Sequence, residues 1–298
     1  MAEASTGAQL PAAILIAGPT ASGKSALALQ LAAERGGVVI NADSMQVYRE
    51  LRVVTARPTT EDEAAVPHRL YGHVPATEAY SAGRYLRDAE AEIGAAIAAG
   101  RVPIVVGGTG LYFKALIEGL SPIPEIPADI RAHWRAEAER LGPAALHDLL
   151  GARDPAMAGR LRRSDPQRIV RALEVVEATG RSLAVWQAMP GRPVVDPRRS
   201  EKIVVAPPRE VIAARADARF EAMMAAGALA EVAALMALGL EPALPAMRAL
   251  GVAPLARHLS GEVGRDAAVA EAKRDTRAYV RRQQTWLKRH MIAWKWLT

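Results

Sequence analysis

The segment GPTASGKS, residues 18–25, constrains this chain more than any other feature of its sequence. Its spacing, Gly-x-x-x-x-Gly-Lys-Ser, is that of a phosphate-binding loop, in which glycines let several backbone N–H groups turn towards an anion. An apolar run, residues 12–17, precedes the segment, and a helix-like stretch, residues 25–34, follows it. A strand, a loop and a helix in this order favour phosphate binding over a chance glycine-rich turn.

All eight residues of this loop are predicted to bind phosphate: Gly18, Pro19, Thr20, Ala21, Ser22, Gly23, Lys24 and Ser25. Lys24 supplies a positive charge to the phosphate oxygens, and the Ser25 hydroxyl is placed to ligate Mg²⁺. The Thr20 hydroxyl can reach an oxygen of a leaving group. The pattern does not say to which molecule the phosphate belongs.

Two further apolar runs, residues 38–40 and 102–106, end in polar or glycine-rich turns, and helical stretches such as residues 81–99 lie between them. This alternation predicts an α/β fold, with a core of the P-loop NTPase type built on a parallel sheet. Ligands of such sheets bind at the carboxyl ends of the strands. We therefore expect residues 18–25, 41–44 and 107–110 to meet at one end of the sheet.

Proline-rich segments at residues 121–127 and 189–197 enclose a region of short helices. Breaks at Gly142-Pro143, Asp154-Pro155 and Asp165-Pro166 separate these helices. Residues 202–206 then form another apolar run, and a long basic helix is predicted near residues 266–290. The sequence thus predicts a core domain of residues 1–119 and 201–298, with a helical insertion domain of residues 120–200.

The chain has 298 residues, a formal net charge of +6 and no cysteine, which excludes disulfides, thiolate metal sites and cysteine nucleophiles. Its six histidines show no metal-binding spacing. The first ten residues lack the pattern of a signal peptide, and the alanine-rich stretches contain charged residues and glycines. We expect a cytoplasmic protein with no membrane contact.

Five arginines cluster between residues 160 and 171. Such a cluster is usually a solvated helix face, and contact with nucleic acid is the sharper alternative.

Asp43 follows the second apolar run and should face the phosphate site. Three roles are open to its carboxylate: a group beside a metal ion, a general base, or the N-cap of a following helix.

Arg215 and Arg219 are four residues apart and should share one helix face. They either pair with acidic residues such as Asp217 or stabilise charge on a pyrophosphate.

These residues leave two classes of enzyme. One is a nucleoside or nucleotide kinase with a helical lid, and the other is a transferase that holds a pyrophosphate leaving group.

Several segments together resemble the tRNA dimethylallyltransferases, also called isopentenyltransferases. Beside the phosphate loop they are DSMQVY at residues 43–48, TARP at 55–58, PHRL at 67–70, VGGTGLY at 106–112, DPQRIVRALE at 165–174 and TRAYVRRQQTW at 276–286. The phosphate loop is generic, whereas the DSMQVY and DPQR segments are specific to the family. The matches run in family order over most of the chain.

The resemblance implies transfer of a dimethylallyl group from dimethylallyl diphosphate to the exocyclic amine of an adenosine in tRNA, with release of pyrophosphate and help from Mg²⁺. That adenosine lies 3′ to the anticodon in tRNAs that read codons beginning with U. The catalytic residues implied are Asp43 as the base, with Thr20, Lys24 and Arg219 at the leaving group. The phosphate loop then holds a leaving group and transfers no phosphoryl.

The resemblance also implies a set of tRNA contacts: Asp43, Ser44, Met45, Gln46, Thr109, Gln167, Arg168, Ile169, Val170 and Arg171. It gives the insertion domain, with its arginines, the role of contacting the anticodon stem-loop. Many members carry a tyrosine where Val252 stands, so a contact from that position is not expected here. Some eukaryotic relatives carry a C-terminal zinc module; we expect none here and therefore expect the bacterial form. We expect a monomer.

Overall fold

The computed structural model describes residues 11–298, and the chain divides into two compact units. The first unit combines the residues up to Ile117 with Pro193–Thr298, and the second is Glu118–Arg192. Residues 193–200, which the sequence placed in the insertion, belong to the first unit. Val194 and Val195 are buried in its core, and both backbone N–H groups donate to the carbonyl of Leu116. The expected absence of a signal peptide concerns residues 1–10, which lie outside the described residues.

A six-stranded parallel sheet forms the centre of the first unit, in the order β3-β2-β4-β1-β5-β6. The strands are β1 (Ile14–Ala17), β2 (Gly37–Asn41), β3 (His68–Arg69), β4 (Val102–Gly107), β5 (Glu201–Val205) and β6 (Lys295–Leu297). β1 lies between β4 and β5, with Ile14 opposite both Ile104 and Glu201. The parallel α/β core predicted from the sequence is confirmed.

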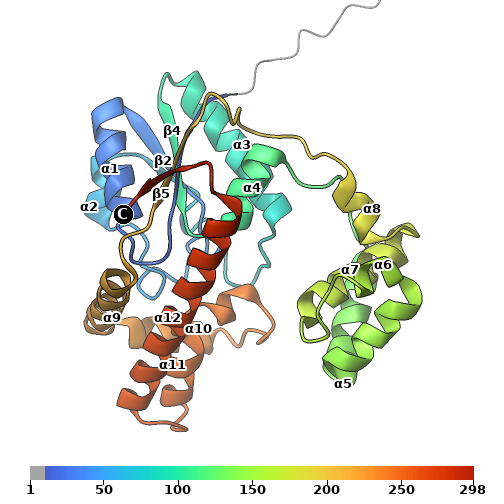
Figure 1. Cartoon of the computed structure of the whole chain (residues 1–298). Coiled ribbons are helices and arrows are strands. Elements are labelled where there is room, and N and C mark those ends of the chain that lie inside the picture. The colour runs from blue at the N-terminus through green and yellow to red at the C-terminus, as the bar shows by residue number, and fades with distance from the viewer. Residues whose placement is uncertain (1–10) are drawn as a thin grey trace, which may run out of the picture. The chain divides into compact units, whose positions relative to one another are not determined.

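Helices cover both faces of this sheet because successive strand residues point to opposite sides (Figure 1). On one face, Ile14 and Ile16 pack with Ala28 and Leu31 of α1 (Lys24–Arg35). On the other face, Leu15 belongs to a larger core that includes residues of α3 (Ala82–Ala98) and α4 (Gly110–Glu118). The first unit also contains α2 (Thr60–Ala65), α9 (Arg209–Ala225), α10 (Ala228–Ala237), the 3₁₀ helix η1 (Pro245–Arg248), α11 (Val252–Leu259) and α12 (Arg265–His290).

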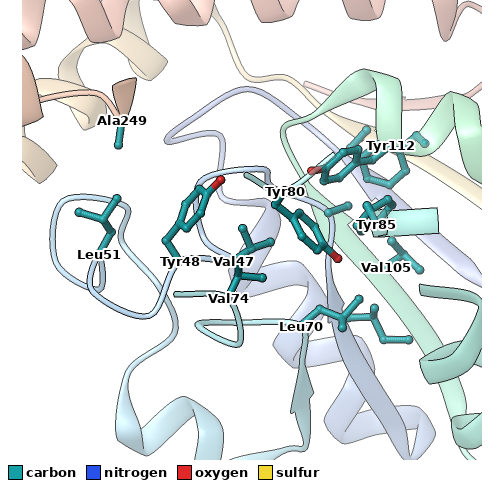
Figure 2. Packing of buried hydrophobic residues seen from close by; sticks show 14 of the residues in the cluster. Val47, Tyr48, Leu51, Leu70, Val74, Tyr80, Tyr85, Val105, Tyr112 and Ala249 are labelled. Atoms are coloured by element: carbon teal, nitrogen blue, oxygen red, sulfur yellow. The ribbon is translucent and has the colours of Figure 1, made fainter. Parts of the chain in front are cut away.

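The larger core fixes the irregular segment that follows β2. Val47, Tyr48 and Leu51 have no exposed surface, and Figure 2 shows them among some of the apolar residues of this cluster. In the same cluster the Tyr85 and Tyr112 rings stack, with centroids 3.7 Å apart and planes 6° from parallel. The segment from Asp43 onwards is therefore tied to the sheet by buried side chains although it is neither helix nor strand.

The second unit is helical, as the sequence predicted, and has its own core around Trp134, Leu146 and Leu173. Its helices are α5 (Ala128–Arg153), α6 (Pro155–Ala158), α7 (Pro166–Thr179) and α8 (Leu183–Ala188). Asp154 and Asp165 cap α6 and α7, and each cap is followed by a proline in the first turn. The break expected at Gly142 is a kink inside α5, where Gly142 has φ of 74°.

Short elements differ most from the sequence predictions. Two short strands were not among the predicted apolar runs: β3, which begins at His68 and has two residues, and β6, which follows the basic helix near the end of the chain. No single helix within residues 11–298 is long and apolar enough to span a membrane; α9 and α10, which meet at a 67° bend, reach that length and composition only as a pair.

Candidate functional site

The loop between β1 and α1 has the form expected for anion binding. Gly23 has φ of 94°, in the left-handed region that glycine adopts without strain, and it turns the chain into α1. No side chain caps this helix end, so the N–H groups of its first turn remain available to an anion. The Gly18 N–H donates to the Gly107 carbonyl at 3.3 Å, which joins the loop to the end of β4.

A basic pocket opens over this loop. It has a volume of about 380 Å³ and is lined by Ala21, Ser22, Gly23, Lys24, Ser25, Arg215 and Arg219. The lining contains three cationic side chains and no carboxylate. Arg215 and Arg219 reach it from one face of α9, as their spacing predicted. Such a pocket suits a compact, multiply charged anion.

Asp217, the acidic residue considered as a partner of these arginines, forms its ion pair elsewhere. Asp217 pairs with Arg277 of α12 at 2.6 Å, so it does not neutralise Arg219. Burial lowers the pKa of Arg219, and the charge of Asp43 opposes that shift. The sharper interpretation of Arg219, a cation held for an anionic ligand, is thus the one the pocket favours.

Lys24 is held close to the loop, where its Nζ donates to the Pro19 carbonyl at 3.2 Å. The Lys24 side chain is partly buried at the edge of the pocket. This burial lowers the pKa of Lys24 from 10.5 to about 8; the charge of Asp43 raises it and that of Arg219 lowers it further. A bound anion would favour the charged form.

Asp43 lies after β2, at the same end of the sheet as the loop. Its N–H donates to Asn41 Oδ1 at 2.8 Å, and its Oδ1 accepts the Met45 N–H at 2.9 Å. No helix follows it, since the next helix in the described chain is α2, so the N-cap role is wrong. The carboxylate closes a tight turn instead, and no described residue donates a hydrogen bond to its Oδ2.

Asn41 is a functional candidate that the motif analysis missed. It has no exposed surface, and its Nδ2 donates to the carbonyls of Asp43 and Leu70 at 2.9 and 3.0 Å. With the Asp43 N–H bound to its Oδ1, this side chain sets the backbone position of Asp43. A polar residue that ends an otherwise apolar strand was the signal available in the sequence.

The third predicted segment joins the other two at this end of the sheet. The Thr109 N–H donates to the Ala42 carbonyl at 3.1 Å, and Thr109 Oγ1 accepts the Ser44 N–H at 3.0 Å. The expectation that residues 18–25, 41–44 and 107–110 meet here is confirmed. Gln46 of the same group directs its amide inward, donating to the carbonyls of Thr55 and Ala56.

A second missed residue, Gln283 of α12, bridges two of these segments. Its side chain accepts the Thr20 N–H and donates to the Gly108 carbonyl. It occupies a buried stripe with Thr276, Val280 and Leu287, so a polar residue at an apolar helical position was the signal in the sequence.

The predicted tRNA-contact residues of the second unit have different exposures. Gln167 and Arg168 are exposed at the start of α7, whereas Ile169 is fully buried in the core of this unit. The Ile169 side chain therefore serves packing and is not placed to contact RNA. Val170 packs partly against the same core, and Arg171 pairs with Glu174 at 3.1 Å.

The residues at the basic pocket fit a magnesium ion that is bound mainly through a substrate. Mg²⁺ prefers oxygen ligands, keeps several waters and often joins one protein group to phosphate oxygens. Ser25 lies exposed in the first turn of α1 and supplies such an oxygen. Within residues 11–298 no group of three or more His, Asp or Glu could hold a metal without a substrate.

Family models match nearly the whole chain. A model described as IPP transferase matches residues 46–290, and one described as isopentenyl transferase matches residues 11–73. A protein of Bradyrhizobium sp. (strain ORS 278) named tRNA dimethylallyltransferase is 56% identical, over 96% of this chain and 93% of its own. A protein of Methylocella silvestris with the same name is 56% identical, over 95% of this chain and 94% of its own.

Solved structures show the same fold. A full-length tRNA isopentenylpyrophosphate transferase from Bacillus halodurans has a TM-score of 0.69 and 31% identity, covering 96% of this chain and 89% of its own. A eukaryotic dimethylallyltransferase, in structures described as snapshots of it acting on tRNA, has a TM-score of 0.78 and 26% identity, covering 93% of this chain and 70% of its own. The residues, the fold and these similarities agree: the chain belongs to the IPP transferase family.

Proposed function

We propose that this chain is a tRNA dimethylallyltransferase. It transfers the dimethylallyl group of dimethylallyl diphosphate to the exocyclic amine of the adenosine 3′ to the anticodon, in tRNAs that read codons beginning with U. The observation that carries the proposal is the placement of the Asp43 carboxylate at the same end of the sheet as a basic phosphate pocket, in a chain of this family. The kinase alternative is not favoured by the relatives.

The basic pocket takes the diphosphate as a leaving group. Breaking the bond between the dimethylallyl carbon and its oxygen leaves a growing negative charge on pyrophosphate. Lys24 and Arg219 line the pocket and are already in place to meet that charge as it develops. Thr20 adds a hydroxyl from the loop itself, and the uncapped end of α1 adds backbone N–H groups.

Asp43 acts as the general base. The exocyclic amine of adenine is a weak nucleophile because its lone pair is delocalised into the ring. As the new nitrogen–carbon bond forms, the amine proton passes to the carboxylate, and the bonding electrons of the broken carbon–oxygen bond leave with pyrophosphate. Because Asp43 Oδ1 accepts the Met45 N–H, Oδ2 is the oxygen that takes the proton.

Ser25 would hold Mg²⁺ together with the diphosphate oxygens. When bound, the ion supplies further positive charge to the leaving group. Lys24, Arg215 and Arg219 bind and orient the diphosphate itself.

For the tRNA we propose contacts from Asp43, Ser44, Met45, Gln46 and Thr109 at the sheet edge and from Gln167, Arg168 and Arg171 on α7. The target base must leave the anticodon-loop stack before its amine can reach a carboxylate in a pocket. The arginines between residues 160 and 171 supply phosphate contacts, which position the RNA without reading its sequence. We further propose a monomer that acts in the cytoplasm, where its tRNA substrates are found.

A prenyl-transfer assay tests this function. Purified protein, Mg²⁺ and radiolabelled dimethylallyl diphosphate are incubated, without ATP, with an anticodon stem-loop that carries adenosines 3′ to the anticodon. We expect label in the RNA and none when these adenosines are replaced by guanosines. Absence of label, with consumption of ATP when a nucleoside or nucleotide acceptor is supplied, would overturn the proposal in favour of a kinase.

A further inference from the structure

The buried amide of Gln283 joins the two loops that build the site. Gln283 lies on α12, is only 6% exposed, and uses both ends of its amide. Its Oε1 accepts the Thr20 N–H at 2.9 Å, and its Nε2 donates to the Gly108 carbonyl at 3.0 Å. The two partners are 263 and 175 residues away along the chain.

Both bonds require an amide. The Thr20 N–H needs an acceptor and the Gly108 carbonyl needs a donor, and a glutamine side chain offers one of each. A carboxylate could satisfy only Thr20, and an apolar side chain of the same length could satisfy neither. Since these groups are buried, losing a partner costs more than the net value of the hydrogen bond.

The bridge connects the leaving-group side of the site with the base side. Thr20 belongs to the loop after β1, and Gly108 is followed by Thr109, whose hydroxyl accepts the N–H of Ser44, the neighbour of Asp43. Gly108 itself is enclosed: a Cβ there would lie 2.3 Å from Gln283 Nε2 and 3.5 Å from Asp43 Oδ2. A shift of Gln283 therefore moves the backbone that lies between the amide and the base.

We propose that Gln283 is a positioning residue that holds the phosphate loop and the Asp43 carboxylate at a fixed separation for prenyl transfer. This inference rests on the proposed function, because it assigns the two loops to the leaving group and the base. It also means that the Thr20 N–H belongs to Gln283, and since the Gly18 and Ser22 N–H groups donate to backbone carbonyls, the phosphate is bound by the N–H groups from Gly23 onwards and that of Ala21. With its backbone fixed in this way, the Thr20 hydroxyl has a defined direction.

The test compares Gln283→Met, Gln283→Glu and the control Gln284→Met. Gln284 is the next residue on α12 and is partly exposed, and its side chain has no hydrogen-bond partner among the described residues. For each protein we would measure kcat for label transfer to the stem-loop, the affinity for pyrophosphate, the melting temperature, and the hydrogen exchange of the Thr20 amide by NMR.

We expect Gln283→Met to lower kcat by roughly 10- to 100-fold, the cost of a small misplacement of reacting groups, with a much smaller change in pyrophosphate affinity. Its Thr20 amide should exchange faster. Gln283→Glu should keep the Thr20 amide protected and still lose kcat, because it cannot donate to Gly108. Gln284→Met should match the wild type in all four measurements.

Three results with Gln283→Met would overturn the inference: an unchanged kcat, a loss of kcat no greater than the loss of folded protein, or an unchanged exchange rate of the Thr20 amide. Failure of the proposed function is distinct, because wild-type protein would then transfer no label. In that case the exchange rate of the Thr20 amide would still decide whether Gln283 holds the loop.

Discussion

Asp43 and Asn41 show how single polar side chains set the chemistry at the end of β2. Asn41 fixes the backbone of Asp43 through its amide, and Asp43 fixes the next turn through Oδ1. The position of Asp43 followed from the sequence, since it comes in the turn after the apolar run of residues 38–40. The turn that the Asp43 carboxylate closes could not be predicted, because the sequence suggested an N-cap and no helix begins there.

Replacing Asp43 by asparagine separates its two roles. Asparagine Oδ1 can still accept the Met45 N–H, so the turn should persist, but an amide cannot take the proton of the amine. We expect kcat for prenyl transfer to fall by about 10² to 10⁴, the range for loss of a general base, with pyrophosphate affinity nearly unchanged. Steady-state transfer assays and calorimetry with pyrophosphate would measure the two effects, and wild-type turnover in the variant would exclude the base role.

Lys24 predicts a pH dependence for anion binding. Its pKa is lowered to about 8 by burial, so in the free protein the ammonium loses its proton as the pH rises through about 8. Binding of pyrophosphate favours the charged form, so affinity should be greatest below pH 8 and decline above it. An ordinary lysine would delay that decline to above pH 10.

Titration calorimetry between pH 7 and 9.5 would measure this decline. Pyrophosphate itself loses protons as the pH rises, so Lys24→Met serves as the control for the ligand. The wild-type affinity relative to that of Lys24→Met should fall with rising pH. A constant ratio across the range would contradict the lowered pKa.

At the scale of elements, helices brace a segment that has no regular structure. Glu231 of α10 accepts the backbone N–H groups of Arg52, Val53 and Val54 at 2.7, 2.7 and 2.8 Å. Charged acceptors make stronger hydrogen bonds than neutral ones. Through these bonds α10 fixes the backbone that follows the segment containing Gln46. The helix lies almost 180 residues later in the sequence.

Replacing Glu231 by glutamine should destabilise the protein. One oxygen can still accept, but the new NH₂ group faces backbone N–H donors and leaves them unpaired. We expect the free energy of unfolding to fall by about 1–3 kcal/mol, the cost of unpaired buried groups at a charged acceptor. Urea denaturation would measure it, with Glu241→Gln, an exposed position after α10, as the control. Equal stability of the two variants would show that Glu231 is not a significant brace.

Elements differ in how well their sequence specifies them. The capped starts of α3, α6 and α7 at Ser81, Asp154 and Asp165 follow from local signals, because the capping residue and its partner are three residues apart. β3 and β6 have two and three residues and exist only because a sheet edge is available to each. Such strands cannot be predicted from their own side chains.

At the scale of the whole molecule, the five arginines between residues 160 and 171 differ in whether they form ion pairs. In the second unit, Arg163, Arg168 and Arg171 each pair with a carboxylate, while Arg160 and Arg162 are exposed and have no ion pair among the described residues. The latter two are the better candidates for phosphate contacts, since no internal pair must be broken.

Arg162→Gln should therefore weaken tRNA binding and flatten its dependence on salt. Each lost phosphate contact reduces the slope of log affinity against log salt concentration by about 1. Filter binding or anisotropy at several salt concentrations would measure the slope. Arg140→Gln, on the same unit outside the cluster, removes an equal charge as the control. Equal slopes for the two variants would mean that the cluster is only a solvated face.

The fold class and the meeting point of three loops could be predicted because they depend on apolar runs and on a general property of parallel sheets. The contacts of Gln283 and Glu231 could not, because each joins segments more than a hundred residues apart. The boundary of the helical unit was placed too late for a related reason. The proline-rich sequence continues to Pro197, which suggested a boundary near residue 200. Val194 and Val195 already pack in the core of the first unit, so that unit resumes at Pro193.

The central position of β1 has a consequence for synthesis on the ribosome. β1 precedes the other described strands along the chain, yet its second neighbour, β5, follows the entire helical unit, and the Ala13 N–H donates to Ser200 Oγ across 187 residues. At about 5–20 residues per second, the nascent chain carries an open edge on β1 for about 10 to 40 s. The helical unit, whose residues are contiguous, can fold during this interval. Protection of that strand edge by chaperones would be needed before the chain is released, and not afterwards.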